Sequence, residues 1–395
     1  MAATVTPALM NTYARSELAF ERGEGAYLIT ADGRRYLDFA SGIAVTALGH
    51  CHPHLVKTLA EQAGKLWHVS NLYRIPDQER LADRLVANSF ADQVFFGNSG
   101  AEAVECGLKL IRKWQDDFGD PKRYRVIGCE GSFHGRTLAT LAAAGNEKYL
   151  KGYAPDVDGF DQVPFGNLNE LRQKIGPETA GILVEPVQGE GGMRAGSVEY
   201  LRGLRQVCDE YGLLLMFDEV QAGMGRTGKL FAHEWAGITP DIVATAKGIG
   251  AGFPMGACLA TNRVAAAFGP GNHGTTFGGN PLAMAVGNAV LDVMLAPGFM
   301  EHVVAMGDRL AGKLDDLIQR HPAVYAERRG KDLIQGLKCH LPNTDLVEKL
   351  RGAGLLTVGA GDNVIRLLPP LIISETEIDL AARLLGDVAA EAKAA

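Results

Sequence analysis

Two apolar runs in the middle of the chain constrain its fold most, because each of them ends in one ionisable side chain. Residues 213–217 (LLLMF) lead to Asp218, and residues 242–246 (IVATA) lead to Lys247. Runs of this length and composition are typical of buried strands, and a glycine-rich segment follows each one. Ligands of α/β sheets collect where strand ends meet such loops. The sequence therefore predicts that Asp218 and Lys247 lie beside one crevice.

This pair has the properties that pyridoxal phosphate requires of its binding site. An acid can keep the ring nitrogen of this cofactor protonated, and an amine can condense with its aldehyde. A lysine at a strand end is most often only a solvated charge. Lys247, however, lies between ATA and GIGAGFPMG, and a close-packed setting of small residues lowers the pKa of an amine. We therefore expect pyridoxal 5'-phosphate as the cofactor.

Strand-like and helical segments alternate through the middle of the chain. The strand-like segments are 93–97, 124–130, 181–187, 213–219 and 241–246, and the helical ones are 101–114 and 197–212. This alternation predicts an α/β fold with a mainly parallel sheet that is covered by helices on both faces. Near the N-terminus, residues 26–39 are typical of a hairpin with Asp32 and Gly33 at its turn.

The pattern changes from about residue 283 onwards, where long helical segments give way to strand-like 332–341 and a helical tail. This change predicts a second, smaller α+β domain. We divide the chain into an N-terminal segment that packs with the small domain, a large cofactor-binding domain and the small C-terminal domain. These three parts are residues 1–55, 56–290 and 291–395.

Composition and charge exclude several classes of protein. The 395 residues have a net charge of -7 and no long basic run, so no nucleic-acid surface is expected. No apolar stretch has the length of a membrane span, and the opening MAATVTPALMNTYA lacks the basic start of a secretion signal. The six cysteines include no C-x-x-C pair, which argues against zinc and disulfides and favours a cytoplasmic protein. No metal site is expected.

The segment SGAE at 99–102 lies between a predicted strand and a predicted helix. Ser99 and Glu102 match a capping box, in which the serine caps the helix and the glutamate reaches back. Most capped helices bind no ligand. A helix start that contains Gly100 nevertheless presents free N–H groups and the positive end of the helix dipole, and both favour a phosphate.

Two other motifs resemble ligand sites, and we interpret both as turns. Gly223, Gly225 and Gly228 match the fingerprint G-x-G-x-x-G, but the next segment is short and contains a proline, whereas the fingerprint requires a helix. A nicotinamide or flavin enzyme is therefore disfavoured. The cluster HCHPH at 50–54 has no second ligand pair at zinc spacing, and its proline indicates a turn into a helix.

Aromatic and charged side chains near other strand ends point to an anionic ligand. In FHGRT, Phe133 could stack on a cofactor ring, and Arg136, which we expect to be buried, could hold a carboxylate in two parallel hydrogen bonds. Glu185 and Glu190 lie in EPVQGE, and Arg366 lies near the C-terminus. A charge at a strand end is most often just solvated. A glutamate and a distant arginine could instead pair and unpair, and so accept or refuse an anion.

Six segments, in register along the chain, resemble the class III pyridoxal-phosphate aminotransferases. They are NSGAEA (98–103), FHGRT (133–137), EPVQGEGG (185–192), FDEVQAGMGRTG (217–228), TAKGIGAGFPMGA (245–257) and GTTFGGNPLA (274–283). The order and spacing match from about residue 12 to the C-terminus. This resemblance implies the fold of type I pyridoxal-phosphate transferases and a homodimer whose active sites lie at the subunit interface.

The resemblance also implies a role in cofactor binding for single residues. Lys247 would bond covalently to the cofactor, and Asp218 would pair with its ring nitrogen. Phe133 would stack on the ring, and Gln221 would lie near the phenolic oxygen. The residues implied at the phosphate are Ser99, Gly100 and Ala101, completed by Thr275 and Thr276 of a neighbouring subunit.

The substrate side of the resemblance rests on fewer residues. Arg136 and Arg366 would receive carboxylates, and Glu190 would act as a gate on Arg366. Segments such as NTYARSELAFERGEG and WHVSNLY are most similar to the enzymes that transfer the terminal amine of N2-acetylornithine to 2-oxoglutarate in arginine biosynthesis. Ile43 stands where enzymes of free ornithine have a tyrosine, which leaves room for an N-acyl group.

The identity of the amino donor stays open at this stage. Enzymes that act on 4-aminobutyrate also have an aliphatic residue at the position of Ile43. Succinylornithine, N-succinyl-diaminopimelate and 4-aminobutyrate are therefore alternative donors within the class. A pyridoxal-dependent aminomutase is disfavoured, because two receptor arginines with a gate suit a dicarboxylate co-substrate.

Overall fold

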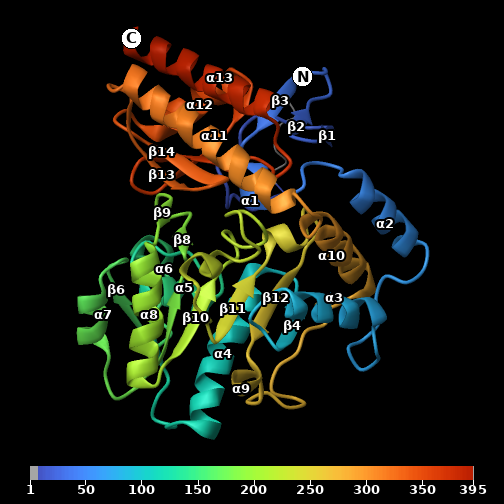
Figure 1. The fold of residues 1–395 in the computed structure, drawn as a ribbon, viewed down its shortest axis with the longest axis vertical. Coiled ribbons are helices and arrows are strands. Elements are labelled where there is room, and N and C mark those ends of the chain that lie inside the picture. The colour runs from blue at the N-terminus through green and yellow to red at the C-terminus, as the bar shows by residue number, and fades with distance from the viewer. Residues whose placement is uncertain (1–7, 395) are drawn as a thin grey trace.

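A mostly parallel sheet forms the centre of the computed structural model, which describes residues 8–394 (Figure 1). In the described part of the chain this sheet has seven strands in the order β4-β12-β11-β10-β7-β5-β6. They are β4 (Gln93–Gly97), β5 (Arg125–Cys129), β6 (Phe160–Val163), β7 (Thr179–Val184), β10 (Leu214–Asp218), β11 (Ile242–Thr245) and β12 (Gly256–Ala260). All run in the same direction except β12, which is antiparallel to both of its neighbours. The predicted α/β sheet is confirmed.

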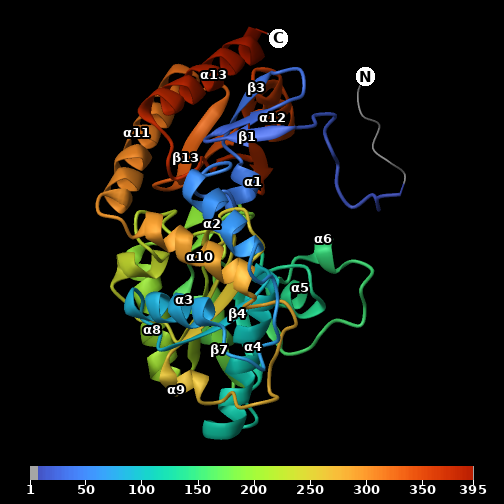
Figure 2. The same ribbon diagram turned by 90° about the vertical axis from the view of Figure 1, so that its right-hand side faces the viewer.

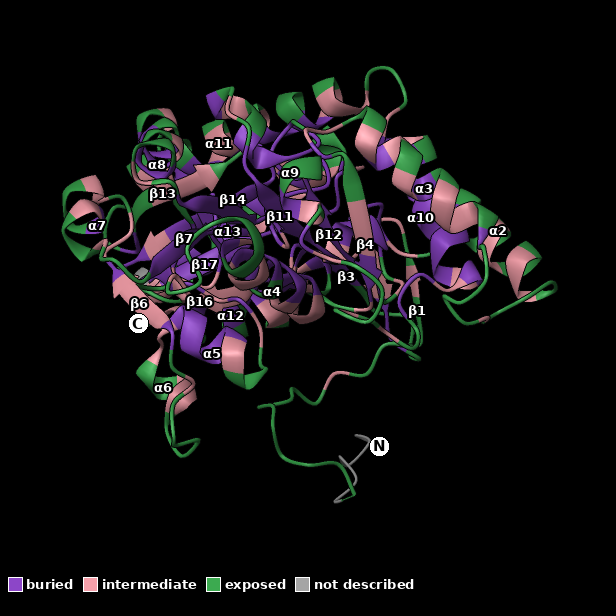
Figure 3. Cartoon of the chain, turned by 90° about the horizontal axis from the view of Figure 1, so that it is seen from below, coloured by how far each residue is buried: buried purple, intermediate pink, exposed green. Residues whose placement is uncertain are grey.

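Helices cover both faces of the central sheet because its strands are apolar on both sides. Successive side chains of a strand point to opposite faces. Met216 accordingly packs into one buried cluster with residues of α4 (Gly100–Phe118), whereas Phe217 packs into another with residues of α8 (Val198–Tyr211). Figure 3 shows that buried residues follow the strands and that exposed residues lie on the outer sides of the helices.

The remaining helices and short strands connect and cover these layers. The α-helices other than α4 and α8 are α1 (Ser41–Ala44), α2 (Pro53–Ala63), α3 (Pro76–Ala87), α5 (Leu138–Ala144), α6 (Glu147–Leu150), α7 (Leu168–Lys174), α9 (Asn262–Ala265), α10 (Pro281–Met294), α11 (Phe299–Arg320), α12 (Asn343–Gly352) and α13 (Glu375–Ala394). No single helix among residues 8–394 has both the length and the hydropathy of a membrane span. Within this range, only α10 and α11 taken together, as a pair bent by 71°, meet both criteria. A short hairpin pairs β8 (Val187–Gln188) with β9 (Arg194–Ala195).

Two smaller sheets lie beyond the central one. An antiparallel sheet of order β13-β14-β17-β16 packs against α11, and its strands are Tyr325–Lys331, Ile334–Cys339, Val364–Leu367 and Val358–Ala360. The other sheet joins the two ends of the chain, because β15 (Leu355–Leu356) pairs in parallel with β3 (Arg35–Asp38). The predicted hairpin is confirmed by the antiparallel pairing of β2 (Tyr27–Ile29) with β3, and β1 (Arg22–Glu24) completes this sheet. The boundaries at residues 55 and 290 stay predictions, and residues 1–7 of the N-terminal segment lie outside the described residues.

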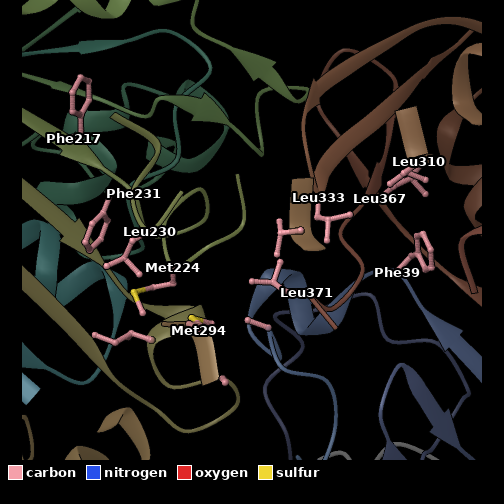
Figure 4. Close-up of a cluster of buried hydrophobic side chains, with 14 of the residues drawn as sticks. Phe39, Phe217, Met224, Leu230, Phe231, Met294, Leu310, Leu333, Leu367 and Leu371 are labelled. Atoms are coloured by element: carbon pink, nitrogen blue, oxygen red, sulfur yellow. The ribbon is translucent and has the colours of Figure 1, made fainter. Parts of the chain in front are cut away.

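One continuous apolar cluster joins the central sheet to the C-terminal part of the chain. Met224, from the loop after β10, and Leu371, from the segment after β17, belong to it (Figure 4). The fully buried guanidinium of Arg226 crosses the same junction, donating from Nη1 to the carbonyl of Leu333 at 3.0 Å and to that of Pro369. No carboxylate among the described residues pairs with Arg226, and burial lowers its pKa to about 9. The loop after Asp218 is therefore fastened to the C-terminal part by carbonyl groups.

Replacing Arg226 tests this junction. Arg226→Ala is expected to lower the free energy of unfolding by about 3 to 5 kcal/mol, because it leaves buried carbonyls unpaired and opens a cavity. Thermal unfolding of the purified variant measures the loss. The control is Arg328→Ala, whose partly exposed ion pair with Asp315 at 2.8 Å is expected to contribute less than about 1 kcal/mol. Equal losses in the two variants would contradict the role of Arg226.

Candidate active site

A cavity of about 340 Å³ opens at the carboxyl edge of the central sheet. The chain leaves β4, β5, β7, β10 and β11 at this edge, because these strands are parallel to one another. The residues predicted from the sequence that line the cavity are Ser99, Gly100, Ala101, Phe133, Glu190, Asp218, Gln221 and Lys247. Asp218 and Lys247 therefore lie beside one crevice, as the two apolar runs predicted.

The carboxylate of Asp218 is held from two sides at the end of β10. Its Oδ2 lies 2.8 Å from Nδ1 of His134, and its Oδ1 accepts a hydrogen bond of 3.0 Å from the N–H of Val220. Asp218 is only 4% exposed, and His134 is also buried. A buried carboxylate needs such partners. His134 had no predicted role, and its only signal in the sequence was its place in the motif FHGRT.

Lys247 is the second residue after β11 and the first of the short 3-10 helix Lys247–Ile249, and its backbone conformation is rare for side chains with a Cβ. Its φ is +49°, in the left-handed region, and such positions cluster at functional sites. Burial lowers the pKa of the Lys247 amine, and the charge of Arg366 lowers it further, against the opposing effect of Asp218 and Glu190. The low-pKa setting that the small residues around Lys247 predicted is confirmed.

The start of α4 forms another wall of the cavity. Ser99 caps this helix, since its Oγ accepts a hydrogen bond of 3.2 Å from the N–H of Glu102. The carboxylate of Glu102 reaches back one residue further than predicted, to the N–H of Asn98. A Cβ on Gly100 would lie 2.7 Å from Cγ1 of Val220, so glycine lets the loop after Asp218 approach the helix. First-turn N–H groups have no partner within a helix and so suit an anion.

Phe133 and Gln221 line the space between Asp218 and the start of α4. The N–H of Phe133 donates to Oε1 of Glu185 at 2.8 Å, which fixes the loop that presents the ring. Oε1 of Gln221 is buried and has no hydrogen-bond partner within residues 8–394. The cavity wall thus contains an aromatic ring and an amide side chain, which can contact a ligand there.

Glu190 and Arg366 form an ion pair although they are 176 positions apart in the sequence. Arg366 is only 2% exposed, and its Nη2 also donates to the carbonyl of Gly359 at 3.0 Å. The backbone carbonyl of Glu190 accepts from the N–H of Gly361 at 2.8 Å. Glu190 lines the cavity and Arg366 lies behind it, so the carboxylate separates a buried cation from the cavity.

Arg136 differs from its prediction, because it is exposed in this chain. Its guanidinium carbon lies 4.0 Å from the ring centre of Tyr149 and 5.3 Å from that of Phe133. The expectation of burial came from its place just past a strand end, but Arg136 directly precedes Thr137, which caps α5, and the chain is at the surface there. Tyr149, which lies in the next helix, was not predicted as a site residue.

Three further predicted residues lie outside the cavity lining. Ile43 is in α1, a turn with φ of +63° at this residue, and it packs against a cluster that contains Leu368. Val45 lines the cavity from this segment instead. Thr275 and Thr276 lie in the loop after α9, where Oγ1 of Thr275 is 3.4 Å from Nδ2 of Asn98.

The two motifs that we interpreted as turns are turns in the structure. In the HCHPH cluster, His50 and His54 face different partners, Asp38 at 2.8 Å and Asp292 at 2.9 Å, and α2 begins at Pro53. Residues 8–394 contain no group of three or more potential ligand side chains placed to hold a metal ion. The loop 223–228 is followed by the short 3-10 helix Ala232–Ala236 and not by the α-helix of a dinucleotide site.

Comparison with known proteins identifies the family. The model of "Aminotransferase class-III" matches residues 10–388. The chain belongs to the class III aminotransferases. It is 63% identical to an acetylornithine aminotransferase of Brucella melitensis over 95% of this chain and 93% of that relative. This family consists of pyridoxal-phosphate-dependent enzymes, and the cofactor expected from Asp218 and Lys247 is therefore confirmed.

Solved structures of class III aminotransferases share this fold. The ornithine aminotransferase of Toxoplasma gondii superposes with a TM-score of 0.93 at 29% identity, covering 98% of this chain and 93% of its own. The N-acetylornithine aminotransferase of Stenotrophomonas maltophilia K279a has a TM-score of 0.84 at 36% identity and covers 97% and 98%. The type I fold is therefore common to family members with different amino donors, and the donor must be argued from the site.

Glu185 provides a test of the electrostatics of this site. Burial and the nearby charge of Asp218 raise the pKa of Glu185 well above the ordinary 4.5. At a pH between these two pKa values, Glu185 is therefore protonated in the folded protein and ionised in the unfolded chain. The contribution of Glu185 to the free energy of unfolding is then fully present below about pH 4.5 and is lost as the pH rises through the raised pKa.

Glu185→Gln is accordingly expected to flatten the pH dependence of stability. Urea unfolding of the cofactor-free protein between about pH 5 and pH 7 should show a smaller loss of free energy of unfolding in the variant than in the wild type. Equal slopes in the two proteins would contradict a protonated, buried Glu185.

Proposed function

We propose that this class III aminotransferase is an N2-acetylornithine:2-oxoglutarate 5-aminotransferase, an enzyme of arginine biosynthesis. The observation that supports this function most is the Glu190–Arg366 ion pair at a cavity that also contains Lys247 and Asp218. A cation that a glutamate can cover suits an enzyme whose two substrates differ in charge. The names of relatives at 54% to 63% identity support the same donor.

The residues that line the cavity fit pyridoxal phosphate. The bound cofactor supplies an aldehyde and an electron-withdrawing ring. Lys247 would hold the cofactor through its aldehyde, and Asp218, fixed by His134, would pair with the ring nitrogen. Phe133 would cover the ring face, and the side-chain amide of Gln221 would donate a hydrogen bond to the phenolic oxygen.

The phosphate is assigned to the start of α4, at Ser99, Gly100 and Ala101. We propose that Thr275 and Thr276 of a second copy of the chain complete this site, which makes the enzyme a homodimer. Exposed apolar side chains support a second copy, since Leu72 is 88% and Trp67 is 64% exposed. Such side chains are typical of surfaces that another subunit covers.

Lys247 also moves the proton that amino transfer requires. Because burial lowers its pKa, the amine of Lys247 is more easily left unprotonated, and its Nζ can then take a proton from the substrate carbon that bears the transferred nitrogen. The charges of Asp218 and Glu190 oppose this lowering, so the amine stays basic enough to hold that proton. The same group can return the proton in the second half-reaction.

The two arginines distinguish the substrates. Arg136 receives the single carboxylate of N2-acetylornithine while Glu190 covers Arg366. 2-Oxoglutarate has two carboxylates and engages both arginines, which requires Glu190 to leave Arg366. The backbone of Glu190 is fastened by the N–H of Gly361, so the change is a movement of the side chain alone. Ile43 lies on the segment that also supplies Val45 to the cavity. Because Ile43 is apolar, it places no polar side chain against the acyl group of the substrate.

Single half-reactions with different donors test the proposed substrate. The enzyme loaded with pyridoxal phosphate is mixed with N2-acetylornithine, succinylornithine, N-succinyl-diaminopimelate, ornithine or 4-aminobutyrate, and the change in cofactor absorbance is followed. N2-acetylornithine should react with the highest kcat/KM. A marked preference for any other donor would overturn the assignment. Borohydride should fix the cofactor to the wild type and not to Lys247→Ala, and a fixed cofactor in that variant would contradict the role of Lys247.

Removing the carboxylate of Glu190 tests the gate. Glu190→Ala leaves Arg366 without its anionic partner, so glutarate should inhibit the reaction of N2-acetylornithine about tenfold more strongly, as expected for one charged hydrogen bond. The inhibition constant measures the change. The control is Glu210→Ala, which breaks the exposed pair with Arg172 and should leave inhibition unchanged. An unaltered inhibition constant in Glu190→Ala would remove the gate from the mechanism.

A further inference from the structure

Arg136 lacks the partners that fix most arginines. Among residues 8–394 its guanidinium makes no hydrogen bond and no ion pair with another side chain or carbonyl. Its contacts are two aromatic rings, Tyr149 at 4.0 Å and Phe133 at 5.3 Å from ring centre to guanidinium carbon. The two rings are themselves edge to face, 6.3 Å apart at 86°. Tyr149 and Phe133 therefore form an aromatic bracket around Arg136.

Hydrogen bonds and a left-handed turn define the path of the chain between Arg136 and Tyr149. Thr137 caps α5, and its Oγ1 also donates to Glu105 of α4 at 2.5 Å. After α5 the chain reverses at Gly145, whose φ is +62°, and α6 then returns Tyr149 to the guanidinium. Figure 2 shows α5 and α6 next to each other at the side of the molecule.

Tyr149 has no other evident task in the fold. It is half-buried and belongs to none of the buried apolar clusters of the described residues. No hydrogen bond of its hydroxyl is found within residues 8–394 either. Its ring is thus available to Arg136, and the chemistry of that contact suits a carboxylate receptor. A guanidinium stacked on a ring keeps its N–H groups, which lie in its own plane, free for two parallel hydrogen bonds.

We propose that Tyr149 is a positioning residue that orients Arg136 for the carboxylate of the substrate. The proposal rests on the proposed function for the role of Arg136, and it adds a residue that the family resemblance did not supply. Without the ring, an exposed arginine side chain populates many rotamers, and binding a carboxylate must order it. Contact with the ring of Tyr149 restricts the rotamers of Arg136 before the substrate binds. Its effect is therefore confined to ligands whose carboxylate reaches Arg136.

Matched ligands separate this effect from general damage. N-acetylputrescine has the acetamido group and terminal amine of N2-acetylornithine but no carboxylate. N-acetylnorvaline has the acetamido group and carboxylate but no terminal amine, so it binds without reacting. Tyr149→Leu should raise the inhibition constant of N-acetylnorvaline and lower kcat/KM for N2-acetylornithine, each about three- to tenfold, as expected for loss of one cation–π contact. The kcat/KM for N-acetylputrescine should stay at the wild-type value.

Two control variants distinguish the ring from its surroundings. Tyr149→Phe keeps the ring and should restore the inhibition constant of N-acetylnorvaline to the wild-type range. Tyr27→Leu removes a similar contact, with Arg35 at 4.5 Å, in the sheet that joins the chain ends. Tyr27→Leu should leave the ratio of the kcat/KM values for N2-acetylornithine and N-acetylputrescine unchanged. In an Arg136→Lys background, Tyr149→Leu should have a smaller effect than in the wild type, because the planar guanidinium is already gone.

Each outcome either supports or overturns the proposal. An equal loss of kcat/KM for both donors in Tyr149→Leu, or an unchanged inhibition constant for N-acetylnorvaline, would overturn it. If N2-acetylornithine proves not to be a substrate, the proposed function fails separately. The inhibition constant of glutarate, which needs both arginines and no amino donor, then decides on Tyr149: a rise in Tyr149→Leu supports the positioning role, and no rise overturns it.

Discussion

The contact between Asp218 and His134 is the interaction on which the rest of the site depends. It fixes a buried carboxylate at the end of β10, with the N–H of Val220 holding the second oxygen. Burying an unpartnered carboxylate would be costly. The loop after β10 can therefore keep its acid in the cavity because β5, which lies beyond β7 in the sheet, leads to His134. Parallel strands make this meeting possible, since their carboxyl ends share one edge of the sheet.

The charges around this acid act on each other. Glu185, Glu190 and Asp218 surround the cavity together with Lys247, and Arg366 stands behind Glu190. Burial alone would leave Lys247 a weak base, and the carboxylates partly restore its affinity for a proton. A movement of Glu190 away from Arg366 therefore has two consequences. It would leave Arg366 without its carboxylate partner, and it would change the balance of charge around the amine of Lys247.

Local patterns in the sequence were sufficient to predict the parts of the fold that depend on neighbouring residues, such as buried strands and helix caps. The apolar runs before Asp218 and Lys247 predicted two buried strands and one common crevice, and the capping residue Ser99 predicted where α4 begins. The antiparallel strand β12 was not predicted. The direction of a strand depends on the path by which the chain re-enters the sheet, and the small apolar residues of β12 do not indicate this path. The family resemblance supplied the roles of Glu190 and Arg366, whose contact spans 176 positions.

The features of the site that the sequence did not predict depend on contacts between residues that are far apart in the chain. Nothing in FHGRT indicates that His134 faces an aspartate 84 positions later, because both arrive there through strand order. The exposure of Arg136 and its contact with Tyr149 depend on the reversal between α5 and α6. Its place just past a strand end suggested burial, whereas the cap of α5 places this residue at the surface. The geometry of the chain at the start of α5, and not the residue composition, therefore determines that Arg136 is exposed.

The protonation state of the cofactor's ring nitrogen shows whether Asp218 pairs with it. The 15N chemical shift of the ring nitrogen can be measured by NMR in the protein reconstituted with 15N-labelled pyridoxal phosphate. If Asp218, held by His134, pairs with this nitrogen, the wild type should give the shift of a protonated ring and Asp218→Asn that of a neutral one. A neutral ring nitrogen in the wild type, or a protonated one in both proteins, would contradict the account.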